Sequence, residues 1–167
     1  MIFWEKEQRD VFVETALTKF SWVPCAFIVL IVEETGASPH LVSKVSWRHV
    51  DFTTNQIKIG RFNYTLSDRV FDLLKQQQER LGFQVRAFPI FRKSSLRWSY
   101  MSPKETVAEF NKVKRKAGLP SILSPDTLRI SIFRERVNAG QLPTSVYKDM
   151  RMSLEEFETY WRKITSV

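Results

Sequence analysis

An unbroken run of eight apolar residues, CAFIVLIV at positions 25–32, constrains the fold of this chain more than any other feature of the sequence. A membrane-spanning helix needs about 20 apolar residues, and this run stops at Glu33 and Glu34. A short run that is apolar on every side has to be buried, as a core helix or strand. A proline before the run and Gly36 after it are typical of helix ends. We therefore expect a helix over about 24–34, buried against the first and last helices of the fold.

Helix-start and helix-stop residues divide the rest of the chain into short elements around a small sheet. Apolar and polar residues alternate between Trp47 and Leu66, with a Thr-Thr-Asn turn and Gly60 as breaks, which predicts two or three antiparallel strands. Helical patterns cover residues 4–19, 39–45, 68–81, 103–117, 125–138, 142–150 and the segment from 154 onward, whereas residues 83–102 are expected to form a long loop. The fold class is therefore α+β and mainly α, with a single domain over residues 1–167.

Positive charge is concentrated in one stretch of the sequence. The net charge is +8, and residues 1–83 contribute none of it because their ten cations balance ten anions. Residues 84–118 carry nine Lys and Arg against Glu105 and Glu109. A concentrated positive field attracts polyanions, so we expect double-stranded DNA as the partner and no membrane; a merely solvated basic face is the plain alternative. The cations of this stretch that we expect at DNA are Arg92, Lys93, Arg97, Lys112, Lys114, Arg115 and Lys116.

Cysteine and histidine usage excludes two common kinds of site. Cys25 is the only cysteine, so the chain forms no internal disulfide, and no Cys/His cluster has zinc-ligand spacing. We expect no metal and no cofactor. The first ten residues lack the basic-then-apolar order of a signal peptide, so a cytoplasmic location is expected, associated with the nucleoid if the source is a bacterium or a phage.

Several short motifs, in order along the chain, resemble the catalytic domain of the tyrosine recombinases, the phage integrase family. They are EETGASPHLVSKVSWRHVDFTTNQIKI at 33–59, YTLSDRVFDLL at 64–74, PIFRK at 89–93, FNKVKRKAGLP at 110–120, SPDTLRISIFRERVNAG at 124–140 and ETYWRKI at 158–164. The resemblance implies the fold of that domain over nearly the whole chain. It also implies that the family's N-terminal core-binding domain is absent from this chain.

The resemblance brings a defined chemistry with it. In the family, a tyrosine hydroxyl attacks a DNA phosphodiester and forms a covalent phosphotyrosine. Two arginines and one or two histidines stabilise the charge that builds on the non-bridging oxygens. A lysine on the β-hairpin protonates the leaving sugar oxygen as a general acid.

Some of these functional positions are matched in this sequence. Arg129 matches the second arginine, and Tyr160 matches the nucleophile. Arg151 falls nine residues before the tyrosine, where the family has His or Trp, and Lys58 or Arg61 lies near the position of the hairpin lysine. If the protein is active, Arg129, Tyr160 and Arg151 are the expected catalytic residues. Arg129, Lys58 and Arg61 are expected at DNA in either case.

Other functional positions depart from the family. Ser38 stands where the first arginine belongs, Asp126 where His or Lys is usual, and Ile130 where His is frequent. Loss of one charged hydrogen-bond donor at such a site raises the barrier by about 3–4 kcal/mol. Asp126 adds an anion that would face a phosphate. The resemblance therefore implies a recombinase fold whose catalytic site has been dismantled.

The retained residues also have purely structural interpretations. Tyr160 lies beside an apolar stripe of the last helix and can serve as an aromatic at the edge of the core. Arg129 can clamp a phosphate without catalysis, or it can form a salt bridge with Asp126 three residues before it. His40 and His49 have no carboxylate or thiol motif around them and are expected to have no functional role.

Three functions remain open on the sequence alone. The first is a DNA-binding protein without catalysis, acting as a regulator such as a phage or mobile-element repressor, or as an architectural factor. The second is an active, divergent recombinase or integrase that cuts and rejoins DNA through Tyr160. The third is a protein–protein module that keeps only the fold. The chain is either a piece of a longer protein or grips one side of DNA, in which case it would work as a homo-oligomer.

Overall fold

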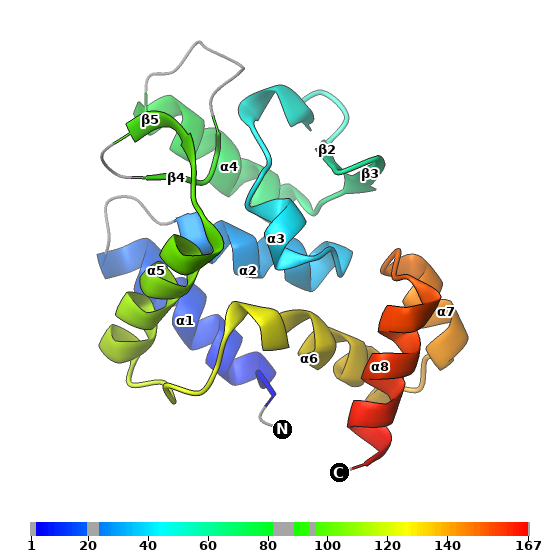
Figure 1. Ribbon diagram of the computed structural model, residues 1–167. Helices are drawn as coiled ribbons and strands as arrows, with labels where there is room; N and C mark the ends of the chain where they lie inside the picture. The colour runs from blue at the N-terminus through cyan, green and yellow to red at the C-terminus, as the bar shows by residue number, and fades with distance from the viewer. Residues whose placement is uncertain (1–2, 20–23, 82–88, 94–95, 167) are drawn as a thin grey trace.

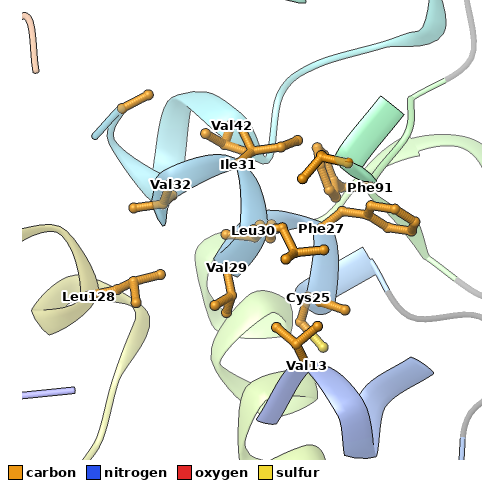
Figure 2. Packing of buried hydrophobic residues seen from close by; sticks show 14 of the residues in the cluster. Val13, Cys25, Phe27, Val29, Leu30, Ile31, Val32, Val42, Phe91 and Leu128 are labelled. Carbon is orange, nitrogen blue, oxygen red and sulfur yellow. The ribbon is translucent and has the colours of Figure 1, made fainter. Parts of the chain in front are cut away.

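The centre of the molecule is helix α2 (Pro24–Thr35), in a computed structural model that describes residues 3–19, 24–81, 89–93 and 96–166. Every residue of the run 25–32 is at most 5% exposed. Figure 2 shows side chains of other elements directed at this run, among them Val13, Phe91 and Leu128. The helices that contact α2 are α1 (Lys6–Lys19), α3 (Pro39–Val42), α4 (Asp68–Leu81), α5 (Pro103–Ala117) and α6 (Pro125–Asn138).

The expected burial of the apolar run is confirmed, but one of its expected partners is wrong. The first helix does pack against α2. The last helix, α8 (Leu154–Thr165), instead has its main contacts with α6, as does α7 (Pro143–Asp149). Figure 1 shows α7 and α8 together at one side of the domain, beyond α6. Because α6 separates them from α2, the end of the chain covers the outside of the core.

A three-stranded antiparallel sheet follows α3, as the alternation of the sequence predicts. Its strands are β1 (Val50–Asp51), β2 (Gln56–Ile59) and β3 (Phe62–Thr65), in the order β1-β2-β3. Ile57 and Ile59 of β2 are buried, whereas Lys58 between them is exposed. Ile57 pairs with Tyr64, and Ile59 pairs with Phe62. The sheet therefore directs one side of β2 at the core and leaves the other side in solvent.

The beginning of the expected strand region is a 3-10 helix instead, η1 (Trp47–His49). The imidazole of His49 turns back, and its Nδ1 atom accepts the backbone N–H of Ser46 at 3.1 Å. This contact, together with the bond between the two side chains, caps the short helix. Local capping thus overrides the alternation of apolar and polar residues at this point.

The expected long loop over 83–102 contains a second hairpin, so this part of the prediction is wrong. Strand β4 (Arg92–Lys93) pairs with β5 (Leu96–Tyr100) in an antiparallel two-stranded sheet. The five residues of β5 alternate apolar and charged or polar residues, which is the period of a strand. Phe91 directly before the hairpin is fully buried, which ties β4 to the core. Residues 82–88 of the expected loop lie outside the described part of the chain.

A buried arginine near the start of the chain fixes α1 to the rest of the core. Arg9 is 1% exposed, and its guanidinium donates to the carboxylates of Glu33 at 3.0 Å and Glu135 at 2.5 Å. A third bond reaches the carbonyl oxygen of Trp4 at 3.0 Å, and the Trp4 N–H donates to Ser131 Oγ at 2.8 Å. These bonds join α1 to α2 and α6, and the carboxylates compensate the burial of the positive charge.

We expect the burial of α2 to control stability. Ile28 is fully buried, so Ile28→Asp places an unpaired charge in the core and should cost several kcal/mol in the free energy of unfolding. Ile122→Asp is the matched control, because Ile122 is 61% exposed and the same change there should cost less than about 0.5 kcal/mol. Urea denaturation of both variants measures the difference. Equal losses of stability would contradict the assignment of the core.

Candidate nucleic-acid site

The side chain of Arg129 is the centre of the candidate site, and it joins three separate segments of the chain. It is 5% exposed and lies on the second turn of α6. Its Nε atom donates to the carbonyl oxygen of Gly36 at 2.7 Å, and Nη2 donates to the carbonyl oxygen of Met150 at 2.8 Å. Its Nη1 atom forms an ion pair with Glu156. All three nitrogen atoms of the guanidinium are therefore engaged within the protein.

Glu156 is positioned by the first turn of α8. Ser153 is the N-cap of this helix, and its Oγ accepts the N–H of Glu156 at 3.1 Å. The Glu156 carboxylate in return accepts the N–H of Ser153 at 3.3 Å, which completes a capping box. The other carboxylate oxygen is thereby directed at Arg129. The alternative salt bridge between Arg129 and Asp126 is not formed among the described residues, and the partner of Arg129 is Glu156 instead.

Tyr160 follows Glu156 by about one turn of α8 and is half-buried. Its ring packs edge-on against Phe133 of α6, with 6.1 Å between the ring centroids. Burial raises the pKa of the Tyr160 phenol, and the charges of Glu156 and Asp126 act in the same direction, while Arg129 acts against them. The net result is a pKa above the ordinary value of 10.0. A phenol with a raised pKa is less ready to become the phenolate that attacks phosphorus.

An acidic hollow lies beside Tyr160. Its lining includes both Glu155 and Glu156, together with Ser153 and Thr159. A DNA phosphate that approached the phenol from this side would meet two carboxylates and no lining cation. Like charges in this arrangement disfavour the approach of a phosphate.

A second tyrosine, Tyr64 of β3, lies within the electrostatic reach of the same arginine. Burial raises the pKa of Tyr64, and the charges of Arg129 and Arg151 act against this shift. Beside Tyr64 on the strand, the ring of Phe62 is contacted by two guanidinium groups. The Cζ atom of Arg61 lies 4.9 Å from the centroid of this ring, and that of Arg151 lies 5.3 Å from it. Such cation–π contacts hold both charges at the edge of the hairpin.

Arg151 reaches this place through an unusual backbone conformation. Its φ is +52°, which lies in a region of backbone conformation that residues other than glycine rarely adopt. Arg151 is exposed and directly follows Met150, whose carbonyl oxygen is bound by Arg129. The structure thus brings together Arg61, Arg129 and Arg151, three of the cations that the sequence singles out.

The three positions that depart from the recombinase pattern lie in different surroundings. Ser38 is the N-cap residue of the short helix α3, and its side chain makes no capping hydrogen bond. Asp126 is exposed in the first turn of α6. Ile130 is 3% exposed and is part of the packed interior. None of the three supplies a cation or a proton to the group around Arg129.

The basic residues at the end of α5 do not behave alike. Lys112 pairs with Glu109 at 2.6 Å, while Arg115 and Lys116 are exposed. Lys114 is 3% exposed, and its ammonium donates to the carbonyl oxygens of Ser121 and Leu123. Burial lowers the pKa of Lys114. Its charge is therefore engaged in holding the segment after α5, and a phosphate cannot reach it in this conformation.

The structure describes only part of the expected basic surface. The backbones of Arg92, Lys93 and Arg97 lie in the β4–β5 hairpin, and their side chains are outside the described part. Arg86 also lies outside it. Among the described residues, no group of three or more His, Cys, Asp and Glu could hold a metal ion. No described helix combines the length and the apolar character required to cross a bilayer.

Two members of the site were not expected from the sequence, Tyr64 and the role of Glu156 at Arg129. The capping-box position of Glu156 is a local signal that the sequence does contain, but its second partner is 27 residues away. Tyr64 has no motif of its own. Its place beside Arg151 depends on how the β2–β3 hairpin packs near the end of α7, and no local sequence pattern predicts that packing.

Solved structures of recombinases share this fold. XerA recombinase matches with a TM-score of 0.77 over 96% of this chain at 14% sequence identity. The Tn1549 transposon integrase, in complex with transposon right end DNA, gives 0.72 over 96% at 14% identity. XerH site-specific recombinase, bound to difH substrate, gives 0.71 over 98% at 15% identity. This chain spans 58%, 61% and 51% of the lengths of these three proteins, respectively.

Neither a protein-family model nor a curated protein sequence matches this chain. The structural likenesses confirm the expected fold, that of a tyrosine-recombinase catalytic domain. At 14–15% identity they establish the fold alone.

The structural role of Lys114 has a measurable consequence. Lys114→Met removes two charge-assisted hydrogen bonds and leaves two carbonyl oxygens without their donor, so it should lower the free energy of unfolding by about 1.5–3 kcal/mol. Lys116→Met, two residues further along the same helix, should change it by less than about 0.5 kcal/mol because Lys116 is exposed. Chemical denaturation of both variants compares them. If Lys114→Met left the free energy of unfolding unchanged, the two bonds of Lys114 would not be holding the segment after α5.

The raised pKa values of Tyr64 and Tyr160 predict a pH dependence. The chain has four tyrosines, and we expect these two to ionise above pH 10 in an absorbance titration of the folded protein. Tyr160→Phe should remove one of the late-titrating groups. Because the unfolded chain releases these protons first, their stabilising contribution is complete below about pH 10 and is lost as the pH rises through the folded values. A Tyr160 that titrates below pH 10 would contradict its assigned surroundings.

Proposed function

We propose that this chain, whose fold is that of a tyrosine-recombinase catalytic domain, binds double-stranded DNA and does not cut it. The observation that carries the proposal is the state of Arg129. Two of the three nitrogens of its guanidinium are bonded to the carbonyl oxygens of Gly36 and Met150, so at most the one that faces Glu156 could turn to a reacting phosphate. The position of the first arginine holds Ser38, which has no charge to replace it.

The surroundings of Tyr160 support the same proposal. Its pKa is raised, and the hollow beside it contains two carboxylates. Removal of one oxyanion-stabilising donor typically slows such a reaction by about 10²–10³-fold. The lack of a first arginine and the ion pair on the second would together slow the reaction far more than one such loss.

The ability to bind DNA rests on a different set of residues. The exposed cations Lys58, Arg61 and Arg151 lie at or beside the β2–β3 hairpin, and no carboxylate among the described residues pairs with them. Exposed arginines and lysines bind backbone phosphates without reading the sequence. The Tn1549 integrase and XerH were solved with DNA, which agrees with a DNA-binding role for this fold. Such a domain would serve as a regulator, for example a repressor of a phage or mobile element, or as an architectural factor.

The basic residues form two separate groups. Figure 1 shows the C-terminal end of α5, which carries Arg115 and Lys116, on the opposite side of the view from the β2–β3 hairpin. Because the two groups lie on opposite sides, one short duplex cannot contact both of them at once. We place the DNA at the hairpin group, because that group adjoins Arg129 and Tyr64.

A pair of charge reversals tests this placement. Lys58→Glu with Arg61→Glu, and Arg115→Glu with Lys116→Glu, change the net charge equally and alter only exposed side chains. Mobility shifts at several salt concentrations should show that the hairpin reversal weakens duplex binding and flattens its salt dependence, since each lost phosphate contact lowers the slope by about 0.9. The α5 reversal should have the smaller effect. The opposite ranking would move the interface to α5.

The absence of cutting is tested with a nicked suicide duplex, which traps the covalent adduct of a tyrosine recombinase. The wild-type chain and Tyr160→Phe should both bind the duplex, and neither should form an adduct. An adduct that disappears in Tyr160→Phe would overturn the proposal and establish the alternative, a divergent recombinase. The observation in favour of that alternative is the position of Tyr160 on α8, where the charge of Arg129 acts to lower the pKa of its phenol.

A further inference from the structure

The ion pair between Arg129 and Glu156 is only half enclosed. The side chain of Arg129 is 6% exposed, whereas that of Glu156 is 39% exposed. Two of the three guanidinium nitrogens face backbone carbonyl oxygens that belong to the fold. The third, Nη1, faces a side chain that is partly in solvent. The accessible side of the arginine is therefore the side that Glu156 covers.

The helix that carries Glu156 packs on the outside of the domain. No residue of α8 is fully buried. Its contacts with α6 include Phe157 and Tyr160, whose rings pack against Phe133. The capping box between Ser153 and Glu156 is internal to α8, so it survives when the carboxylate leaves Arg129. Separation of the ion pair consequently costs one contact and does not require the end of the helix to unfold.

A carboxylate and a phosphodiester can both serve as the partner of this nitrogen. Both are anions with paired oxygens that accept charge-assisted hydrogen bonds from a guanidinium. An arginine that is held by two carbonyl oxygens keeps its orientation when the anion on Nη1 is exchanged for another. The positive charges of Arg61 and Arg151 lie nearby on the hairpin, where they favour an incoming anion.

We propose that Glu156 occupies, within the chain itself, the binding position of a DNA backbone phosphate on Arg129, and that the two anions compete for it. The carboxylate therefore weakens DNA binding, and displacement of Glu156 opens an additional phosphate contact. This inference rests on the proposed function, because it needs DNA to reach the hairpin side of the domain. It assigns Glu156 as a residue that lowers the affinity of the domain for DNA.

Two isosteric variants test the proposal. Glu156→Gln removes the charge and keeps the capping box, since glutamine serves at this position as well as glutamate. Glu155→Gln is the matched control, because it makes the same charge change on the adjacent, exposed residue. We expect Glu156→Gln to bind a duplex on the order of 5-fold more tightly than wild type, with a salt slope steeper by about 0.9, the value of one phosphate contact. Glu155→Gln should change the affinity by less than about 2-fold.

The outcomes separate the two proposals. Equal changes in both variants, or weaker binding by Glu156→Gln, would overturn the role of Glu156 and leave DNA binding intact. Failure of the wild type and of both variants to bind any duplex would overturn DNA binding itself and the competition with it. If Glu156→Gln fails to fold, the wild-type protein still decides the question. The side-chain ¹⁵N resonance of Arg129 should shift on saturation with a duplex, and an unchanged resonance would contradict displacement of Glu156.

Discussion

Complete burial of one helix is the constraint on which the rest of the structure depends. Residues 25–32 offer no polar face to solvent, so α2 has to be enclosed on every side. Five helices provide the enclosure, and their contacts determine where the loops between them can lie. The turn that follows α2 places Gly36 beside α6, and this is the point where Arg129 bonds to its carbonyl oxygen. The candidate site is thus located by the packing of the core.

The same bonds explain how one arginine can serve the fold and the site together. Arg129 connects the turn after α2, the end of α7 and the start of α8. Removal of such a buried and fully bonded guanidinium would leave carbonyl oxygens without donors and a carboxylate without its cation. Arg129 is therefore required for stability, independently of any role in chemistry. Tyr160 likewise has a structural role that does not depend on its hydroxyl, because its ring packs against Phe133.

Much of this architecture could be predicted because its signals are local. Ser-Pro pairs and glycines mark helix ends within a few residues, and the capping position of Glu156 is visible in the same way. The contacts that the sequence did not predict join residues that are distant in sequence. Asp126 is the near neighbour of Arg129, yet the ion pair forms with Glu156 from another helix. Lys114 resembles its solvated neighbours until the segment after Gly118 folds back over it. Such contacts depend on tertiary packing, which short patterns do not encode.

Gly36 is required by the packing of the turn after α2, independently of any chemistry at the site. Its φ is +65°, and a Cβ atom added to it would lie 2.4 Å from the side chain of Met150. A larger residue at this position would have to adopt a strained backbone conformation and displace Met150, so the core itself requires the glycine. Ser38, two residues later, has a φ of −63°, and its side chain makes no capping hydrogen bond, so its backbone does not require one particular residue. The turn glycine is therefore a requirement of the fold, and its presence says nothing about whether the chain cuts DNA.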